Sequence, residues 1–143
     1  MGNAACGKSA LISQISGNID FPKEYQMTLH CEMALKTVAM ENQSEVDLYI
    51  KDMGGHEAFQ EFAHRYYRTT QVFVIVFDAN NLFSFKSVKD YCARYRAAKG
   101  LDSRGVLIGT KIDLQRQVTY SQGLELAKEL SLEYFECSAV RMK

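Results

Sequence analysis

The stretch that decides the fold is GNAACGKS, Gly2 to Ser9, at the start of a 143-residue chain. It fits the phosphate-binding loop pattern G-x-x-x-x-G-K-[ST]. Glycines let the backbone fold around a phosphate with its N–H groups pointing inward, Lys8 adds a positive charge, and the Ser9 hydroxyl suits Mg²⁺. The amphipathic segment Ala10–Ile15 continues the loop as the required helix. These residues therefore predict a nucleotide-phosphate site.

The same residues allow a second interpretation. Met1-Gly2 followed by small residues also looks like the start of an N-myristoylation signal. That signal prefers Ser or Thr at the sixth residue, where this chain has Cys6. Phosphate binding accounts for Gly7, Lys8 and Ser9 as well, so we favour the phosphate loop and keep lipidation as the alternative.

Composition indicates one globular domain over residues 1–143. The chain is 47% hydrophobic, has one proline and carries a formal net charge of zero. Its charges are scattered and balanced, which argues against a nucleic-acid partner. The four cysteines form no C-x-x-C pair, so we expect free thiols in a reducing, cytoplasmic setting. No apolar run is long enough for a transmembrane segment.

Continuous apolar runs predict buried parallel strands at Gln71–Phe77 and Gly105–Thr110, covered on both faces. Helical spacing follows each strand, in 85–99 and 120–130, and a short strand at Tyr134–Cys137 closes the alternation. The apolar positions at helical spacing are Val88, Tyr91, Cys92 and Tyr95 in the first helix and Leu124, Ala127 and Leu130 in the second. This order predicts an α/β fold.

The period changes earlier in the chain. Residues 46–52, VDLYIKD, alternate apolar and polar side chains, which is typical of a half-exposed antiparallel strand. The partner is Glu32–Met40, across the polar turn at 41–44. We therefore expect a mostly parallel sheet with one antiparallel hairpin at its edge.

A second chemical motif, DMGGHE, ends that half-exposed strand at Asp52–Glu57. A carboxylate at a strand end can hold Mg²⁺ through water, and the N–H of Gly55 can approach a phosphate closely. Alone, D-x-G-G reads as a turn. Between a phosphate loop and a buried strand, it predicts a switch segment.

A third motif, Thr110-Lys111-Ile112-Asp113, follows a buried strand directly. The Asp113 carboxylate can accept the ring N–H and the exocyclic amine of guanine, a donor pair that adenine lacks, while the Lys111 stem covers the base. Cys137-Ser138-Ala139 is a weaker fourth motif, in which a backbone N–H reaches a base oxygen. By itself, the K-x-D pattern of Lys111 to Asp113 would indicate only solvated charges on a loop.

The order GNAACGKS, Thr28, DMGGHE, TKID and CSA resembles the Ras-superfamily small GTPases, nearest to the Rab and Rab-like branches. The resemblance covers nearly the whole chain. FPKEYQMT, VDLYIKD and GVLIGTKIDL are similar to the Rab-like GTPases of intraflagellar transport. The resemblance to the Ras-superfamily small GTPases implies the P-loop NTPase fold, binding of GTP and GDP with Mg²⁺, and GTP hydrolysis.

The resemblance also implies roles for individual residues. The phosphate-binding set is Gly2, Ala5, Cys6, Gly7, Lys8, Ser9, Ala10, Tyr25, Thr28 and Gly55. The guanine-binding set is Phe21, Thr110, Lys111, Asp113, Ser138 and Ala139. Ser9, Thr28 and Asp52 would hold Mg²⁺, and His56, Thr28 and Gly55 would serve hydrolysis. Effectors and regulators would bind residues 21–33 and 53–68, in a transport complex of the cytoplasm or cilium, or at a membrane reached through partners.

Two departures bear on activity. His56 stands where the family usually has the glutamine that orients the attacking water, so we expect slow hydrolysis. No arginine precedes Thr28, so a partner would supply one. The alternative is a GTP-binding interaction module without turnover. A P-loop kinase or ATPase ranks lower, because such proteins lack the guanine-reading TKID.

A third departure concerns both ends. The family's first strand would precede Gly2, and its last helix would follow Ser138-Ala139. We therefore expect a GTPase domain that is incomplete at both termini, with strand edges exposed and the N-terminal side of the phosphate loop unanchored.

Overall fold

A computed structural model describes residues 1–17, 26–56 and 60–141. Its elements confirm the predicted α/β fold. In chain order they are α1 Lys8–Ile15, β1 Cys31–Ala39, β2 Glu45–Met53, α2 Gln60–Tyr67, β3 Val72–Asp78, α3 Leu82–Lys86, α4 Val88–Lys99, β4 Arg104–Thr110, α5 Tyr120–Glu129 and β5 Glu133–Glu136.

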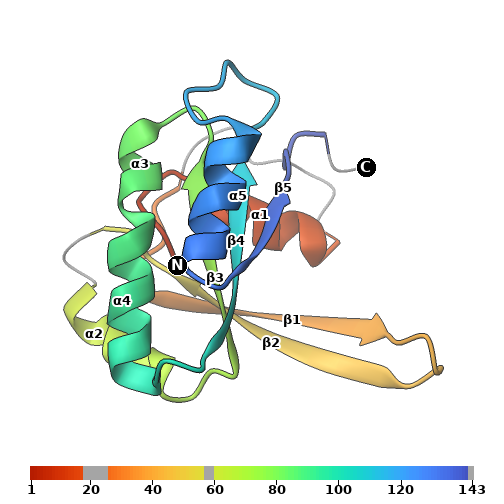
Figure 1. Ribbon diagram of the computed structural model, residues 1–143. Coiled ribbons are helices and arrows are strands. Elements are labelled where there is room, and N and C mark those ends of the chain that lie inside the picture. The colour runs from red at the N-terminus through yellow and green to blue at the C-terminus, as the bar shows by residue number, and fades with distance from the viewer. Residues whose placement is uncertain (18–25, 57–59, 142–143) are drawn as a thin grey trace.

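The three parallel strands lie in the order β3-β4-β5, with Ile75 opposite Leu107 and Leu107 opposite Tyr134. One face of this sheet packs against α4 and α5, which run side by side in Figure 1. Ile75, Phe77 and Leu107 are fully buried on that face. The core therefore forms where a β-branched and aromatic run meets the apolar stripes of two helices.

The other face departs from the prediction of strands covered on both sides. Val72, Val74 and Phe135 are 52%, 37% and 54% exposed, whereas Val76 is 4% exposed. The phosphate loop reaches Val76, where the Cys6 thiol donates to the Val76 carbonyl at 3.2 Å. In the described part of the chain, cover on this face is thus concentrated at the loop end of the sheet.

The predicted hairpin is present as β1 and β2, paired from Cys31 with Met53 to Ala39 with Glu45. It forms a two-stranded sheet of its own and projects from the rest of the fold in Figure 1. Leu48, expected to face inward, is 43% exposed, whereas Asp52 is 5% exposed. Burial is confined to the end of β2 because α1 packs there.

The helix predicted over 85–99 is two helices, α3 and α4, which meet at Ser87. The α3 helix begins three residues earlier because the Asn81 side chain accepts from the N–H groups of Phe83 at 2.9 Å and Ser84 at 3.3 Å. Such capping satisfies N–H groups that have no partner within the helix. In α5, Leu126 is buried at 7% exposure where the spacing had favoured Leu124.

The phosphate loop is tied to the sheet on its N-terminal side, contrary to the expectation of an unanchored loop. The Met1 amino nitrogen donates to the Val74 carbonyl at 2.8 Å, and the Val76 N–H donates to the Met1 carbonyl at 2.9 Å. This exchange continues the hydrogen-bond pattern of a parallel sheet by one residue. It fixes the start of the loop beside Val74 and Val76 of β3.

Replacing Leu107, which is fully buried, with Ala should lower the free energy of unfolding by about 2–5 kcal/mol, because a cavity remains in the core. Urea unfolding followed by circular dichroism measures the loss. Leu101→Ala makes the same chemical change at a side chain that is 81% exposed and should leave stability nearly unchanged. Equal losses in the two variants would contradict this account of the core.

Candidate functional site

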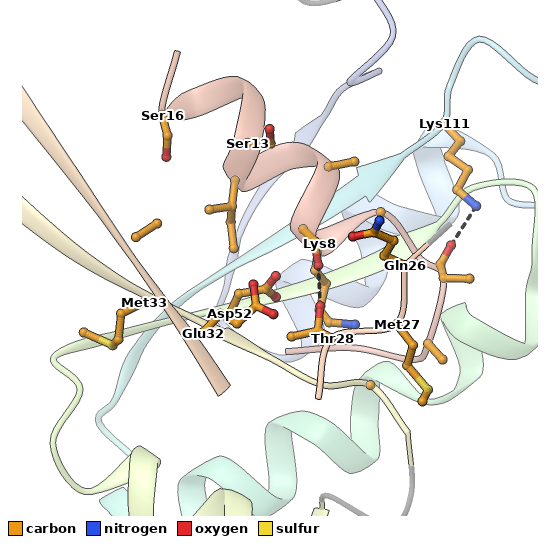
Figure 2. A pocket seen from close by; sticks show the side chains of 18 of the residues that line it. Lys8, Ser13, Ser16, Gln26, Met27, Thr28, Glu32, Met33, Asp52 and Lys111 are labelled. Atoms are coloured by element: carbon orange, nitrogen blue, oxygen red, sulfur yellow. Dashed lines mark hydrogen bonds between the residues drawn. The ribbon is translucent and has the colours of Figure 1, made fainter. Parts of the chain in front are cut away.

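A cavity of about 820 Å³ opens beside the N-terminus of α1. Figure 2 shows Lys8, Thr28 and Asp52 gathered near the start of this helix, whereas Lys111 reaches the phosphate loop from a separate segment, the loop after β4. The predicted site residues that line the cavity are Ala5, Gly7, Lys8, Ser9, Ala10, Thr28, Asp52, Gly55 and Lys111. Gly2, Cys6 and Thr110 are buried. Phe21 and Tyr25 lie outside the described residues.

Lys8 is buried, with 7% of its surface exposed. Its ammonium donates to the carbonyls of Gly2 at 3.0 Å and Asn3 at 2.8 Å, both within the phosphate loop. Among the described residues, no carboxylate lies within ion-pair distance of this ammonium. A buried cation held by neutral oxygens keeps its full charge available, which suits an anionic ligand.

Cys6 lies below the loop surface, with 1% of its area exposed. Burial raises the pKa of its thiol, although the nearby Lys8 ammonium opposes that effect. The thiol is therefore protonated near neutral pH, where it donates to Val76. Its side chain packs the loop onto β3, so any contact of Cys6 with a phosphate has to come from the backbone.

The three residues expected to hold Mg²⁺, Ser9, Thr28 and Asp52, line the same cavity. The hydroxyls of Ser9 and Thr28 are hydrogen-bonded at 2.8 Å, although they are 19 residues apart. Asp52 is 5% exposed, and within the described ranges its Oδ1 atom has no hydrogen-bond partner. Glu32 is its register partner on β1 and lines the same cavity. Two hydroxyls and a buried carboxylate are oxygen donors of the kind that Mg²⁺ prefers, so these residues fit that ion.

Gly55 lies directly against the backbone of the phosphate loop. A Cβ atom added at this position would be 2.5 Å from the Ala4 nitrogen. Only glycine permits so close an approach without moving the loop. His56 follows on the surface, with an exposed side chain. The segment after β2 and the phosphate loop therefore form one wall of the site.

Thr110 joins the end of β4 to the phosphate loop. It is 2% exposed, and its hydroxyl donates to the Cys6 carbonyl at 2.6 Å and lies 3.0 Å from the Phe77 carbonyl. One hydroxyl thus spans the loop, β3 and β4. This contact gives the threonine a structural role.

Lys111 takes a left-handed backbone conformation, with φ of 57°. Its ammonium donates to the Ala5 carbonyl at 2.7 Å and lies 2.7 Å from a carboxylate oxygen of Asp78. Asp78 belongs to none of the predicted motifs. The available signal was its position at the end of a buried strand, where the parallel register sets it opposite Thr110.

Asp113 and Ser138 lie together, at the loops that follow β4 and β5. The Ser138 hydroxyl is the main cause of a lowered pKa at the Asp113 carboxyl, although no well-aligned hydrogen bond joins these side chains in the described residues. Ala139 follows and is half-buried. The carboxylate therefore stays ionised and able to accept two N–H donors.

Comparison with known proteins gives consistent matches. The Ras family model matches residues 1–143. An intraflagellar transport protein 27 homologue of Trypanosoma brucei brucei is 29% identical, over 99% of this chain and 78% of the relative. The mouse homologue of that protein is 33% identical, with shares of 99% and 78%. Ras-related protein Rab-3 of Caenorhabditis elegans is 31% identical, over 97% of this chain and 64% of its own length.

Replacing Thr110 with the isosteric valine should lower the free energy of unfolding by about 1–3 kcal/mol, because the buried Cys6 carbonyl loses its donor. Thr110→Ser keeps the hydroxyl and should keep most of the stability. Chemical unfolding of both variants measures the difference. If valine and serine proved equally stable, the hydroxyl would not be what joins the loop to β4.

Proposed function

The chain belongs to the Ras family, and from that premise we propose that it is a Rab-like guanine-nucleotide switch that binds GTP and GDP with Mg²⁺. The observation that carries the proposal is the buried Lys8 ammonium, held by the carbonyls of its own loop. It lines the same cavity as Asp52, whose Oδ1 atom has no hydrogen-bond partner among the described residues. Charges of opposite sign at one cavity suit a phosphate chain and a divalent cation together.

Selectivity for guanine rests on Asp113. Its carboxylate accepts from the ring N–H and the exocyclic amine of guanine, whereas adenine has an acceptor at the corresponding ring nitrogen. A buried polar site that is left unpaired discriminates strongly against the wrong base. Lys111 connects this specificity to the phosphates, because it contacts the phosphate loop through Ala5.

Ser9, Thr28 and Asp52 are the residues that would hold Mg²⁺, which neutralises phosphate charge when it is bound. The protein's own groups would orient the phosphates and the switch segment. Lys8 and the backbone N–H groups of the loop orient the phosphates, and Gly55 brings the switch segment against the loop. Positioning and electrostatic stabilisation account for most of the catalysis of phosphoryl transfer.

Hydrolysis by this chain is proposed to be slow without a partner. His56 stands at the position that orients the attacking water, and its side chain is exposed. Its ring has a shorter reach than a glutamine side chain. The same histidine is also compatible with the alternative function, a GTP-binding module without turnover. Replacing His56 therefore tests whether the chain is a slow GTPase or such a module.

We propose that partners bind residues 21–33 and 53–68. In the described part of the first range, Met27, Leu29 and Met33 are 46%, 58% and 60% exposed. Two of the relatives are named as intraflagellar transport proteins, and on that basis we place this chain in a transport complex of the cytoplasm or cilium. Among the helices of the described ranges, none is both long and apolar enough to cross a bilayer.

Purified protein should bind GDP and GTP in preference to ADP and ATP. Asp113→Asn should weaken GDP binding by about a hundredfold or more and improve binding of xanthosine diphosphate, whose 2-oxo group accepts from the new amide. Fluorescent nucleotide titration measures both affinities. Asp102→Asn is the same change at an exposed residue and should alter neither. Equal affinity of the unmodified protein for GTP and ATP would refute the proposed function.

His56→Gln should raise single-turnover GTP hydrolysis by about tenfold, because a longer neutral amide can orient water and phosphate together. Lys89→Gln, at an exposed residue of α4 outside both proposed partner ranges, is the control and should have no effect. Each protein is measured with and without cell extract. Extract-stimulated cleavage supports a switch, whereas absence of cleavage in every case supports the module without turnover.

A further inference from the structure

We propose that Arg116, Glu136 and Tyr134 form a clamp that positions Asp113 and Ser138 for guanine recognition. This inference rests on the proposed function, since it concerns the base side of the same site. None of the three clamp residues belongs to the sequence motifs discussed above. They are positioning residues, acting on the base through Asp113 and Ser138.

The central contact is a two-pronged ion pair. One guanidinium nitrogen of Arg116 lies 2.8 Å from Glu136 Oε1, and the other lies 2.5 Å from Oε2. The planar fork of arginine matches the two carboxylate oxygens, which fixes orientation as well as distance. The pair therefore restrains both backbones that carry it.

Those backbones are the two that carry the guanine-reading residues. Arg116 follows Asp113 by three residues, on the loop after β4. Glu136 precedes Ser138 by two residues and ends β5, opposite Gly109 of β4. The strand ends are also joined where the Cys137 N–H donates to the Gly109 carbonyl at 2.9 Å. The clamp extends this connection from the strands to the loops beyond them.

Tyr134 holds Glu136 from the other side. Its hydroxyl donates to Glu136 Oε1 at 2.7 Å, and its ring packs 5.3 Å from that of Tyr120. Gly123 of helix α5 leaves space for this hydroxyl, since any other residue would place a Cβ atom where the hydroxyl lies. Burial, and then the Glu136 carboxylate, raise the pKa of Tyr134, so the hydroxyl remains a donor.

The clamp differs from an ordinary surface ion pair. Its side chains are 33% and 10% exposed, whereas those of Lys89 and Glu129 in another ion pair are 56% and 57% exposed. The Arg116 guanidinium is the main cause of a lowered pKa at Glu136. Exposed pairs contribute little because water screens them and side-chain entropy opposes them. Lys89 and Glu129 therefore provide a matched control.

The test compares the affinities for GDP and for inosine diphosphate. Inosine diphosphate lacks the exocyclic amine that would donate a hydrogen bond to the Asp113 carboxylate. The ratio of the two affinities reports how well the carboxylate is placed, and a general loss of stability would not change it. Arg116→Gln should raise the GDP dissociation rate by about tenfold and bring the GDP-to-inosine-diphosphate affinity ratio closer to one. Lys89→Gln should change neither quantity.

Two further variants keep the test decisive should Arg116→Gln fail to fold. Tyr134→Phe removes only the hydroxyl and should lower the affinity ratio in the same direction, by a smaller factor. Exchanging the charges, with Arg116→Glu and Glu136→Arg together, should restore part of the ratio lost in Arg116→Glu alone. Circular dichroism confirms that each variant compared is folded.

The outcomes separate the clamp from the function on which it rests. If folded Arg116→Gln and Tyr134→Phe keep the ratio of the unmodified protein, the clamp is overturned while guanine binding stands. If the unmodified protein binds GDP and ADP equally, the proposed function falls and the clamp falls with it. A lower ratio in both variants, with Lys89→Gln unchanged, supports the clamp.

Discussion

The site depends on one buried contact, the hydrogen bond from the Thr110 hydroxyl to the Cys6 carbonyl. Phosphate loops have many backbone polar groups and few apolar side chains, so packing alone does not hold them in place. Here the loop is fixed to the strand ends at that hydroxyl and to the edge of β3 through Met1. Lys111 crosses the same junction to Ala5. The positions of the residues proposed to bind phosphate and base therefore follow from a few hydrogen bonds between the loop and the strand ends.

Much of the fold could be read from local patterns in the sequence. The strands at 72–78 and 104–110 and the hairpin agree with their predicted ranges to within one residue, because apolar runs and alternation are properties of neighbouring residues. The boundaries of α3 could not be predicted from apolar spacing. The start of α3 depends on the Asn81 side chain, and its end on a local break at Ser87. Burial of the second sheet face was overestimated, because cover is a property of the whole assembly and the run 71–77 does not reveal it.

In the candidate site too, local motifs could be read from the sequence, whereas contacts between distant segments could not. The GKS, DMGG and TKID motifs contain part of the cavity lining, because motifs place chemistry at fixed offsets along the chain. The lining residues in these motifs are Gly7, Lys8, Ser9, Asp52, Gly55 and Lys111. Asp78, Arg116 and Glu136 escaped notice, since each acts on a partner brought close only by the register of parallel strands. One charged residue on a loop gives no sign of such a partner. Side-chain pairs between separate loops thus mark the limit of inference from a single sequence.

The contacts of Lys8 have a consequence for ligand exchange. The carbonyls of Gly2 and Asn3 act as an internal substitute for an anion, so the ammonium is solvated by the protein itself. Under the proposed function, a phosphate group would compete with these oxygens for the Lys8 ammonium. The net free energy of phosphate binding is therefore the difference between two sets of hydrogen bonds. Under the proposed function, the loop carbonyls would thus set the strength of phosphate binding together with the charge of Lys8.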